Sequence, residues 1–140
     1  MKNVKIILLF ALVVLLAVAV LAGCNDSRPG DYDGEGQYVG EGDIVFRFEV
    51  TDADGEVTAW NVRTNEENLA SALLEVELIA GEVVPVMGLL VTHVNDVRAD
   101  WNLDDAYWAL WVGDEMSMVG VDSVYIEEGV VYAFVFTPAA

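Results

Sequence analysis

The chain has 140 residues, of which 24 are Asp or Glu and 6 are Lys or Arg, and 55% are hydrophobic. This length accommodates one modest domain and excludes a large multidomain enzyme. The net charge of −18 leaves no basic patch for a phosphate backbone, so nucleic-acid binding is excluded. With one Cys and one His, a disulfide framework is excluded and a structural zinc site is not expected.

Residues 1–23 have the layout of a secretory signal. Lys2 and Lys5 form a short basic start, and an uninterrupted apolar run follows from Ile6 to Leu21. This run is shorter than the roughly 18–20 residues that span a bilayer comfortably, so an uncleaved transmembrane anchor is the less favoured alternative.

The end of the apolar run, Leu21-Ala22-Gly23-Cys24, resembles the lipobox of bacterial lipoproteins. The resemblance implies that Cys24 becomes the N-terminus and carries diacylglycerol, so that the protein is extracytoplasmic and anchored to the bacterial cell membrane. The alternative is a free cysteine in a hydrophobic helix. Cleavage would leave four arginines and all 24 acidic residues, a net charge of −20, so the lipid and not electrostatics would hold the protein at the membrane.

The segment after the expected lipid site is rich in Gly, Asp and Glu and has almost no aliphatic residues. Such a composition buries too little apolar area to offset the entropy of ordering the chain. We therefore expect residues 24–42 to be a lipidated cysteine with a flexible acidic tether, and residues 43–138 to form the folded domain.

Two alternating runs open the domain. Residues 44–50 and 56–62 each have the period-2 pattern of a strand with one buried face. Asp52-Ala53-Asp54-Gly55 between them is typical of a hairpin turn. The same four residues resemble a fragment of a calcium loop, but the third oxygen ligand and the distal Glu are missing, so calcium binding is not expected.

A single amphipathic helix is predicted next. Thr64-Asn65-Glu66-Glu67 is typical of a capping box, in which Thr64 and Glu67 cap each other's backbone amides. Apolar residues follow at helical spacing, and Gly81 is placed to end a helix of about four turns. The spaced residues are Leu69, Ala72, Leu73, Val76 and Ile79.

The remaining chain reads as strands and turns. Residues 83–94 are rich in β-branched residues, and a turn is expected at 95–96. Strands are predicted at 107–112, 123–126 and 130–137, with turns at 113–115 and 127–129 between them. The fold class is therefore α+β: one small domain with one helix packed on a mostly antiparallel or mixed sheet.

The order and spacing of these elements resemble the transcobalamin-like C-terminal domain. The most distinctive parts are Tyr107-Trp108 with the strand that follows, and Gly120-Val121-Asp122-Ser123 after the next turn. Many bacterial surface lipoproteins carry this domain, and in animal corrinoid carriers it closes over the ligand that a larger helical domain holds. The similarity covers residues 44–137.

The resemblance implies corrinoid binding through Trp108, Ala109 and Leu110. This sequence departs from the pattern of the animal proteins at two points. The helical partner domain is absent from it, and Ala109 stands where those proteins carry a polar amide side chain. Any site would then be completed by a partner, such as a helical surface protein or a vitamin importer subunit.

The residues themselves are compatible with a macrocycle, which needs aromatic or aliphatic surface and amide partners at its rim. In a strand, Tyr107 shares a face with Ala109, whereas Trp108 and Leu110 lie on the other face. His93 is a less favoured axial metal ligand, and no other metal site is expected. The candidate ligand-binding residues are Tyr107, Trp108, Ala109, Leu110, Trp101 and Asn95.

Two functions follow as hypotheses. The first is a lipid-anchored protein that captures a corrinoid for uptake, with the corrinoid as ligand and no resident cofactor. The second is a protein-interaction module that docks a transporter or another surface protein and binds no small molecule. An enzyme is not expected, because no nucleophile motif, phosphate loop or His-centred triad can be assembled.

Overall fold

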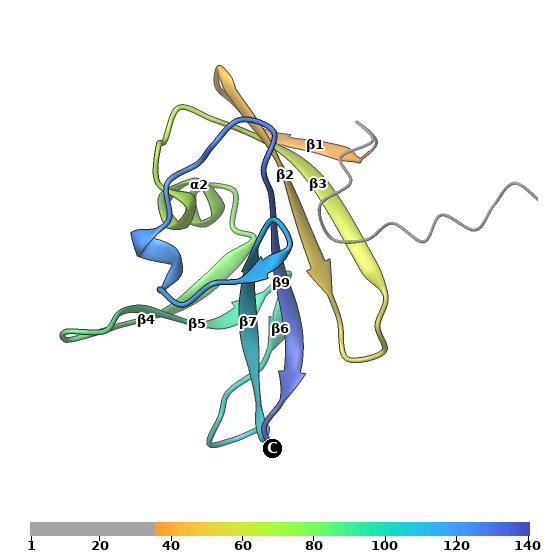
Figure 1. Ribbon diagram of the computed structural model, residues 1–140, viewed down its shortest axis with the longest axis vertical. Helices are drawn as coiled ribbons and strands as arrows, with labels where there is room; N and C mark the ends of the chain where they lie inside the picture. Colours follow the sequence, from red (N-terminus) through yellow and green to blue (C-terminus); the bar gives the residue numbers. More distant parts are fainter. Residues whose placement is uncertain (1–35) are drawn as a thin grey trace, which may run out of the picture.

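The computed structural model describes residues 36–140, so the expected signal peptide, the lipid site at Cys24 and most of the tether lie outside the described residues. Two sheets and one short helix form a single domain, which confirms the predicted α+β class (Figure 1). The larger sheet has the strand order β1-β3-β2-β9-β7-β8, and the smaller has the order β4-β5-β6. The larger sheet is mixed, because β1 with β3 and β2 with β9 are parallel.

The elements in chain order are β1 (Gln37–Gly40), β2 (Ile44–Thr51), β3 (Val57–Thr64), α2 (Leu69–Glu75), β4 (Ile79–Val84), β5 (Gly88–Val94), β6 (Val97–Arg98), β7 (Ala106–Val112), β8 (Glu115–Met116), the 3-10 helix η1 (Val121–Ser123) and β9 (Val131–Pro138). Among the described residues, no helix is both long and apolar enough to cross a membrane.

The predicted leading hairpin is confirmed, since β2 and β3 are antiparallel with Phe48 opposite Trp60. The carboxylate of Asp52 closes the turn by accepting hydrogen bonds from the backbone amides of Asp54 and Glu56, both at 2.9 Å. The turn carboxylate is therefore engaged with backbone donors, as expected of an Asx-type turn.

Strand β1 lies where the sequence predicted flexible tether. It pairs with β3 in parallel, Val39 packs against the core, and the Arg63 guanidinium lies 4.9 Å from the centre of the Tyr38 ring. The tether boundary at residue 42 was therefore wrong: backbone pairing with a neighbouring strand orders a segment whose composition alone would not.

The helix is shorter than predicted and begins later. Its N-cap is Asn68, whose side chain accepts a hydrogen bond from the Ser71 amide, whereas the Thr64 hydroxyl accepts one from Glu66 inside a turn. The helix ends at Glu75, and the backbone of Glu77 turns into the left-handed region at φ 57°.

After Glu75 the helix ends and the chain changes direction. The Leu78 amide donates to the Leu73 carbonyl and the Glu77 amide to the Leu74 carbonyl, which is the Schellman pattern of a terminated helix. Ile79 and Gly81 consequently belong to β4 and not to a four-turn helix. The predicted strand at 123–126 was also wrong, since η1 and one isolated bridge between Asn68 and Tyr125 occupy that region.

The hydrophobic core lies between the larger sheet and the elements that cover one of its faces. Figure 1 shows α2 and η1 on that face, and the β4–β5 hairpin projecting beside them. Phe48 is fully buried and packs edge-on against Phe134, while Leu69 and Leu73 of the helix are also fully buried. Because the cluster of buried core residues runs from Phe46 to Phe134, residues 36–140 contain a complete core.

Tyr132 ties the last strand to the turn before it. Its ring is fully buried edge-on against Phe46, and its hydroxyl accepts a hydrogen bond from the Glu127 amide at 2.7 Å and donates one to the Tyr125 carbonyl at 3.2 Å. Burial raises the pKa of Tyr132 above the ordinary 10.0, against the opposing hydrogen bond from Glu127. Above pH 10.0 the folded chain therefore keeps the hydroxyl proton of Tyr132, which the unfolded chain loses.

We expect the free energy of unfolding to fall as the pH rises above 10.0, because only the folded state retains the Tyr132 proton there. Tyr132→Phe should cost about 1–3 kcal/mol at neutral pH, since the Glu127 amide and Tyr125 carbonyl lose their partner. As the pH rises above 10.0, the free energy of unfolding should fall less for this variant than for the wild-type protein, because the variant has no Tyr132 hydroxyl to lose a proton. Urea unfolding between about pH 8 and pH 11 measures both effects. Parallel stability curves for the two proteins would contradict this account.

Candidate functional site

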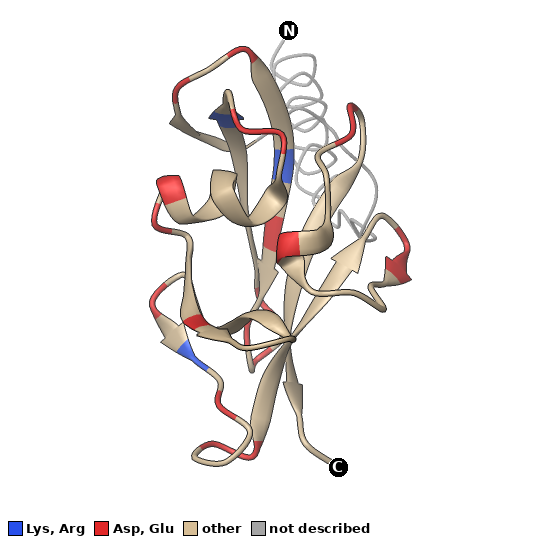
Figure 2. Cartoon of the chain, turned by 90° about the vertical axis from the view of Figure 1, so that its left-hand side faces the viewer, with Lys and Arg blue, Asp and Glu red and all other residues tan. Residues whose placement is uncertain are grey.

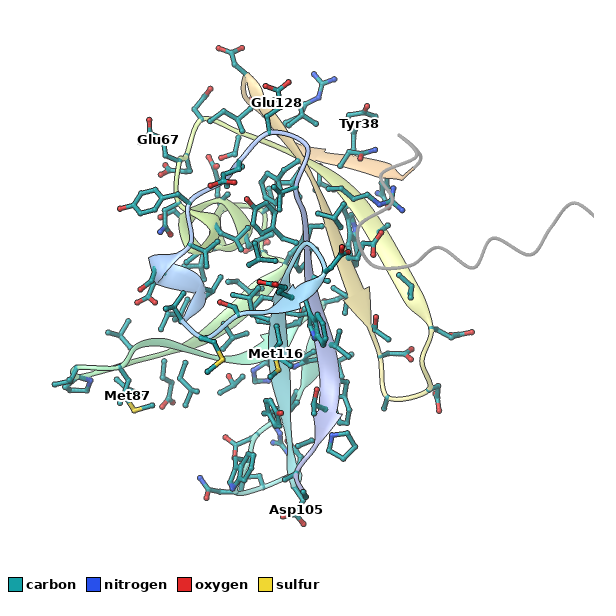
Figure 3. The ribbon with its side chains drawn as sticks, viewed as in Figure 1. Tyr38, Glu67, Met87, Asp105, Met116 and Glu128 are labelled. Carbon is teal, nitrogen blue, oxygen red and sulfur yellow. The ribbon has the colours of Figure 1, made fainter. Side chains whose placement is uncertain are left out.

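A groove of about 360 Å³ lies between the edges of the two sheets. One wall is β5, the floor is β7, and the loop after β8 forms the other wall. In Figure 3 the labelled Met116 lies across β7, on this loop side. The lining residues are Leu89, Leu90, Val91, Tyr107, Trp108, Ala109, Leu110, Met116, Ser117, Val119, Gly120, Val121 and Phe134.

The lining contains no charged side chain, in a chain that carries 24 acidic residues. Figure 2 shows that Asp and Glu gather mainly in the loops and turns, away from β7 and β9. The groove is therefore suited to a neutral ligand with apolar surface, because a charged ligand would lose hydration without gaining an opposite charge.

Strand β7 presents a partly unpaired backbone edge to the groove. It pairs with β9 along its whole length, but with β8 only at Trp111 and Val112. The Leu110 carbonyl accepts a hydrogen bond from the Ser117 amide at 2.8 Å, so the backbone of Leu110 faces away from β9. By the alternation of an antiparallel ladder, the backbone groups of Trp108 face the same way, and no described strand pairs with them there.

This edge can bind amides without any polar side chain. Successive outward-facing residues of a strand are about 6.6–6.8 Å apart and each presents one donor and one acceptor. The backbone N–H groups of Leu110 and Trp108 can therefore donate hydrogen bonds to ligand carbonyls, and the backbone carbonyl of Trp108 can accept one from a ligand amide. The spacing of the strand fixes the order of these contacts.

Four of the predicted site residues line the groove together: Tyr107, Trp108, Ala109 and Leu110. The indole of Trp108 nevertheless belongs to the core, since only 6% of the residue is exposed and its ring packs edge-on against Phe136. Its Nε1 donates a hydrogen bond to the Val97 carbonyl at 3.1 Å. The ring thus positions the strand and offers no free aromatic face.

Trp101 is the exposed aromatic residue next to this region. It is 57% exposed, and its ring lies 5.5 Å from that of Tyr107. Its loop is held by Asp100, which accepts hydrogen bonds from two loop amides, and by the bidentate pair of Arg98 with Asp104. The hydrogen bond from Arg98 lowers the pKa of Asp104, so this loop keeps its ion pair in mildly acidic conditions.

Asn95 and His93 lie apart from the groove. Asn95 begins the turn between β5 and β6 with φ 48°, beside a separate hollow that Leu78 also lines. The Nδ1 atom of His93 lies 3.0 Å from the Thr92 hydroxyl. Within residues 36–140 no group of three or more His, Cys, Asp or Glu side chains is placed to hold a metal ion.

Sequence reasoning missed the two walls of the groove. The first is β5, whose residues Leu89 to Val91 belong to a stretch without charges. Its position depends on Asp122, which accepts a hydrogen bond from the Leu89 amide at 3.1 Å. Gly88 is required beside this carboxylate, because its φ is 83° and a side chain there would collide with Asp122.

The second wall is the loop from Met116 to Val121. The signal in the sequence was the group of apolar residues in this short segment, which includes Met118 and Val119. In the structure Met118 is 91% exposed and Val119 is 55% exposed. Exposed apolar residues gathered around a hollow mark a binding surface more often than isolated ones do.

No family model and no curated protein matches this chain. Solved structures that share its fold include the following two. One is from Ruminococcus gnavus, a protein to which metal binding has been ascribed, with a TM-score of 0.64 at 19% identity over 70% of this chain and 100% of that one. The other is haptocorrin in complex with Cbi, with a TM-score of 0.56 at 21% identity over 69% of this chain. The match covers 25% of the haptocorrin chain.

Proposed function

We propose that this protein captures a corrinoid, or a similarly neutral macrocycle fringed with amides, outside the membrane. The observation that carries the proposal is the uncharged groove with the unpaired backbone edge of β7 along its floor. The fold shared with haptocorrin, whose structure contains Cbi, supports this choice of ligand.

The groove matches the two needs of such a ligand. Leu90, Met116 and Val119 offer apolar contact for the macrocycle, and all three are partly exposed. The backbone of Trp108 and the amide of Leu110 would bind the peripheral amides. In this arrangement the strand edge would supply the polar contacts that the methyl group of Ala109 lacks.

The groove is too small to enclose a corrinoid by itself. Its volume of about 360 Å³ is near the lower end of the roughly 300–1,000 Å³ typical of small-molecule sites. We therefore propose that the protein covers one side of the ligand and that a partner, a helical surface protein or a vitamin importer subunit, covers the other.

The remaining parts of the proposal come from the sequence. A lipid on Cys24 would hold the protein at the outer side of the bacterial membrane, close to an importer. The role is binding and delivery, without catalysis.

Titration calorimetry and absorbance spectroscopy with cyanocobalamin and cobinamide test the proposal. Residues 25–140 are suitable, because they include the complete core. Leu90→Asp should weaken binding at least about tenfold, since it puts a charge into the apolar groove. Val83→Asp is the matched control, because Val83 is 80% exposed on the same hairpin and does not line the groove. No heat and no spectral change with either corrinoid would refute the proposal for the isolated protein.

The unpaired edge of β7 also favours a second candidate function. An extended segment of a transporter or another surface protein could add to β7 as a further strand, with no small molecule involved. In that case corrinoids produce no signal, whereas an importer subunit slows amide hydrogen exchange at residues 106–110.

A further inference from the structure

The methionines of the described chain lie on two neighbouring segments, the tip of the β4–β5 hairpin and β8 with the loop after it. The sequence has four methionines and one cysteine, and residues 36–140 contain Met87, Met116 and Met118. They are 72%, 49% and 91% exposed, so none of the three fills the core. Methionine commonly fills gaps in cores, and an exposed set is instead typical of adaptable binding surfaces.

The three methionines lie on or beside the two segments that form the walls of the groove. Met116 lines it directly, and together with Met118 it also lines a second hollow of about 490 Å³ on the other side of the same loop. Met87 lies at the tip of the β4–β5 hairpin, as Figure 3 shows. Its carbonyl oxygen is 4.0 Å from the position that a side chain on Gly120 would take, so the hairpin tip adjoins the loop. We call these three residues the methionine rim.

We propose that the methionine rim is an oxidation site that weakens the groove's hold on its ligand, an inference that rests on the proposed function for the identity of that ligand. The oxidant is a hydroperoxide. The thioether sulfur attacks one peroxide oxygen, the O–O bond breaks, and the departing oxygen takes a proton to leave as water or an alcohol. The sulfur loses two electrons and the peroxide gains them.

Met87 and Met118 lie beside the lining, so the sulfoxide of Met116 is the one that enters the groove itself. It converts a flexible apolar side chain into a polar one, and its oxygen is a strong hydrogen-bond acceptor. Among the side chains that line the groove, only Ser117, Tyr107 and Trp108 carry a polar group, and the indole hydrogen of Trp108 is already bonded to Val97. The unpaired backbone amides of Trp108 and Leu110 are the donors that the ligand itself would use. A bound apolar ligand would therefore strip water from the Met116 sulfoxide without replacing its hydrogen bonds.

The chain offers no competing thiol in the described part, because its single cysteine is Cys24. The exposure of the rim gives peroxide direct access to all three sulfurs. Oxidation is reversible by methionine sulfoxide reductases, so the modification could be undone without new synthesis.

The test compares residues 25–140 before and after brief treatment with hydrogen peroxide. Mass spectrometry should find one added oxygen atom on each of Met87, Met116 and Met118. Affinity for cyanocobalamin should fall at least about tenfold, and fluorescence of the neutral apolar dye Nile red should fall with it. The matched control replaces all three with leucine, which keeps the apolar volume and cannot form a sulfoxide. Whatever affinity this variant has for the two probes before treatment, peroxide should leave that affinity unchanged.

Complete sulfoxide formation with unchanged binding of both probes would overturn the inference, as would equal peroxide sensitivity in the leucine variant. If the untreated chain binds no corrinoid, the proposed function fails by itself. The Nile red signal still decides the inference in that case, because it reports the polarity of the groove without requiring the corrinoid. Recovery after treatment with a sulfoxide reductase would assign the change to the methionines.

Discussion

Replacing Trp108 with alanine is expected to lower the free energy of unfolding by about 3–5 kcal/mol. The indole is part of the core, packs edge-on against Phe136 at 5.5 Å, and donates a hydrogen bond to Val97. Its removal leaves a cavity beneath β7 and takes away the hydrogen bond that links β7 to the Val97 carbonyl of β6. Stabilities of small domains are about 5–15 kcal/mol, so the loss is a large share of the total. Urea unfolding followed by circular dichroism measures it.

The same substitution would also reduce ligand binding, but through displacement of β7 and not through a lost contact with the ligand. Trp108→Phe and Tyr107→Ala separate these causes. The phenylalanine variant retains most of the packing and lacks the indole hydrogen bond, so it should lose less stability. Tyr107→Ala changes a partly exposed groove residue and should lower affinity with little loss of stability. Wild-type stability of Trp108→Ala combined with lost binding would show that the indole contacts the ligand.

Gly81→Ala is expected to have the second large effect, through the backbone of the smaller sheet. A side chain at Gly81 would collide with the Leu90 carbonyl and approach the backbone of Val91. Neither backbone group can rotate away as a side-chain end could, so β4 and β5 must separate where the pairing register already shifts. We expect a loss of about 3–5 kcal/mol, in the range of strongly disruptive substitutions.

Because Leu89 to Val91 form one wall of the groove, Gly81→Ala should weaken ligand binding more than its stability loss alone requires. Glu82→Ala is the matched control, since it shortens the exposed side chain of the next residue in the same strand and adds no atom toward β5. Thermal unfolding and corrinoid titration of both variants measure the effects. Equal stability of the two variants would mean that the hairpin accommodates a side chain at Gly81.

Local pattern was sufficient for the elements that depend on alternation or turn chemistry. The leading hairpin follows from alternating apolar residues around an Asp-Gly turn, whereas strands β7 and β9 follow from short apolar runs bounded by turn residues, as does the turn at Asn95-Asp96. These signals are reliable because a strand with one buried face must alternate, whatever lies against it. The position of Tyr107 to Leu110 at one site follows from the same strand.

Local pattern failed where two conformations were nearly equal in their local energetics. Thr64 and Glu67 fit a capping box, but Asn68 caps the helix, since its amide group also binds the carbonyls of Asp122 and Val124. Ile79 fits the helical spacing, but it pairs with Val94 in β4. In both cases contacts with distant residues outweigh a difference in propensity of less than about 1 kcal/mol.

The sequence by itself determined the α+β class, the main strands and the position of Tyr107 to Leu110 on one strand. Only the tertiary structure decided that Trp108 faces the core, that Asn95 and His93 lie elsewhere, and that β5 and the Met116–Val121 loop complete the groove. The reason is physical. Alternation along a strand assigns side chains to two faces, but which segments come together, and whether an edge stays unpaired, depends on packing between residues far apart in the chain.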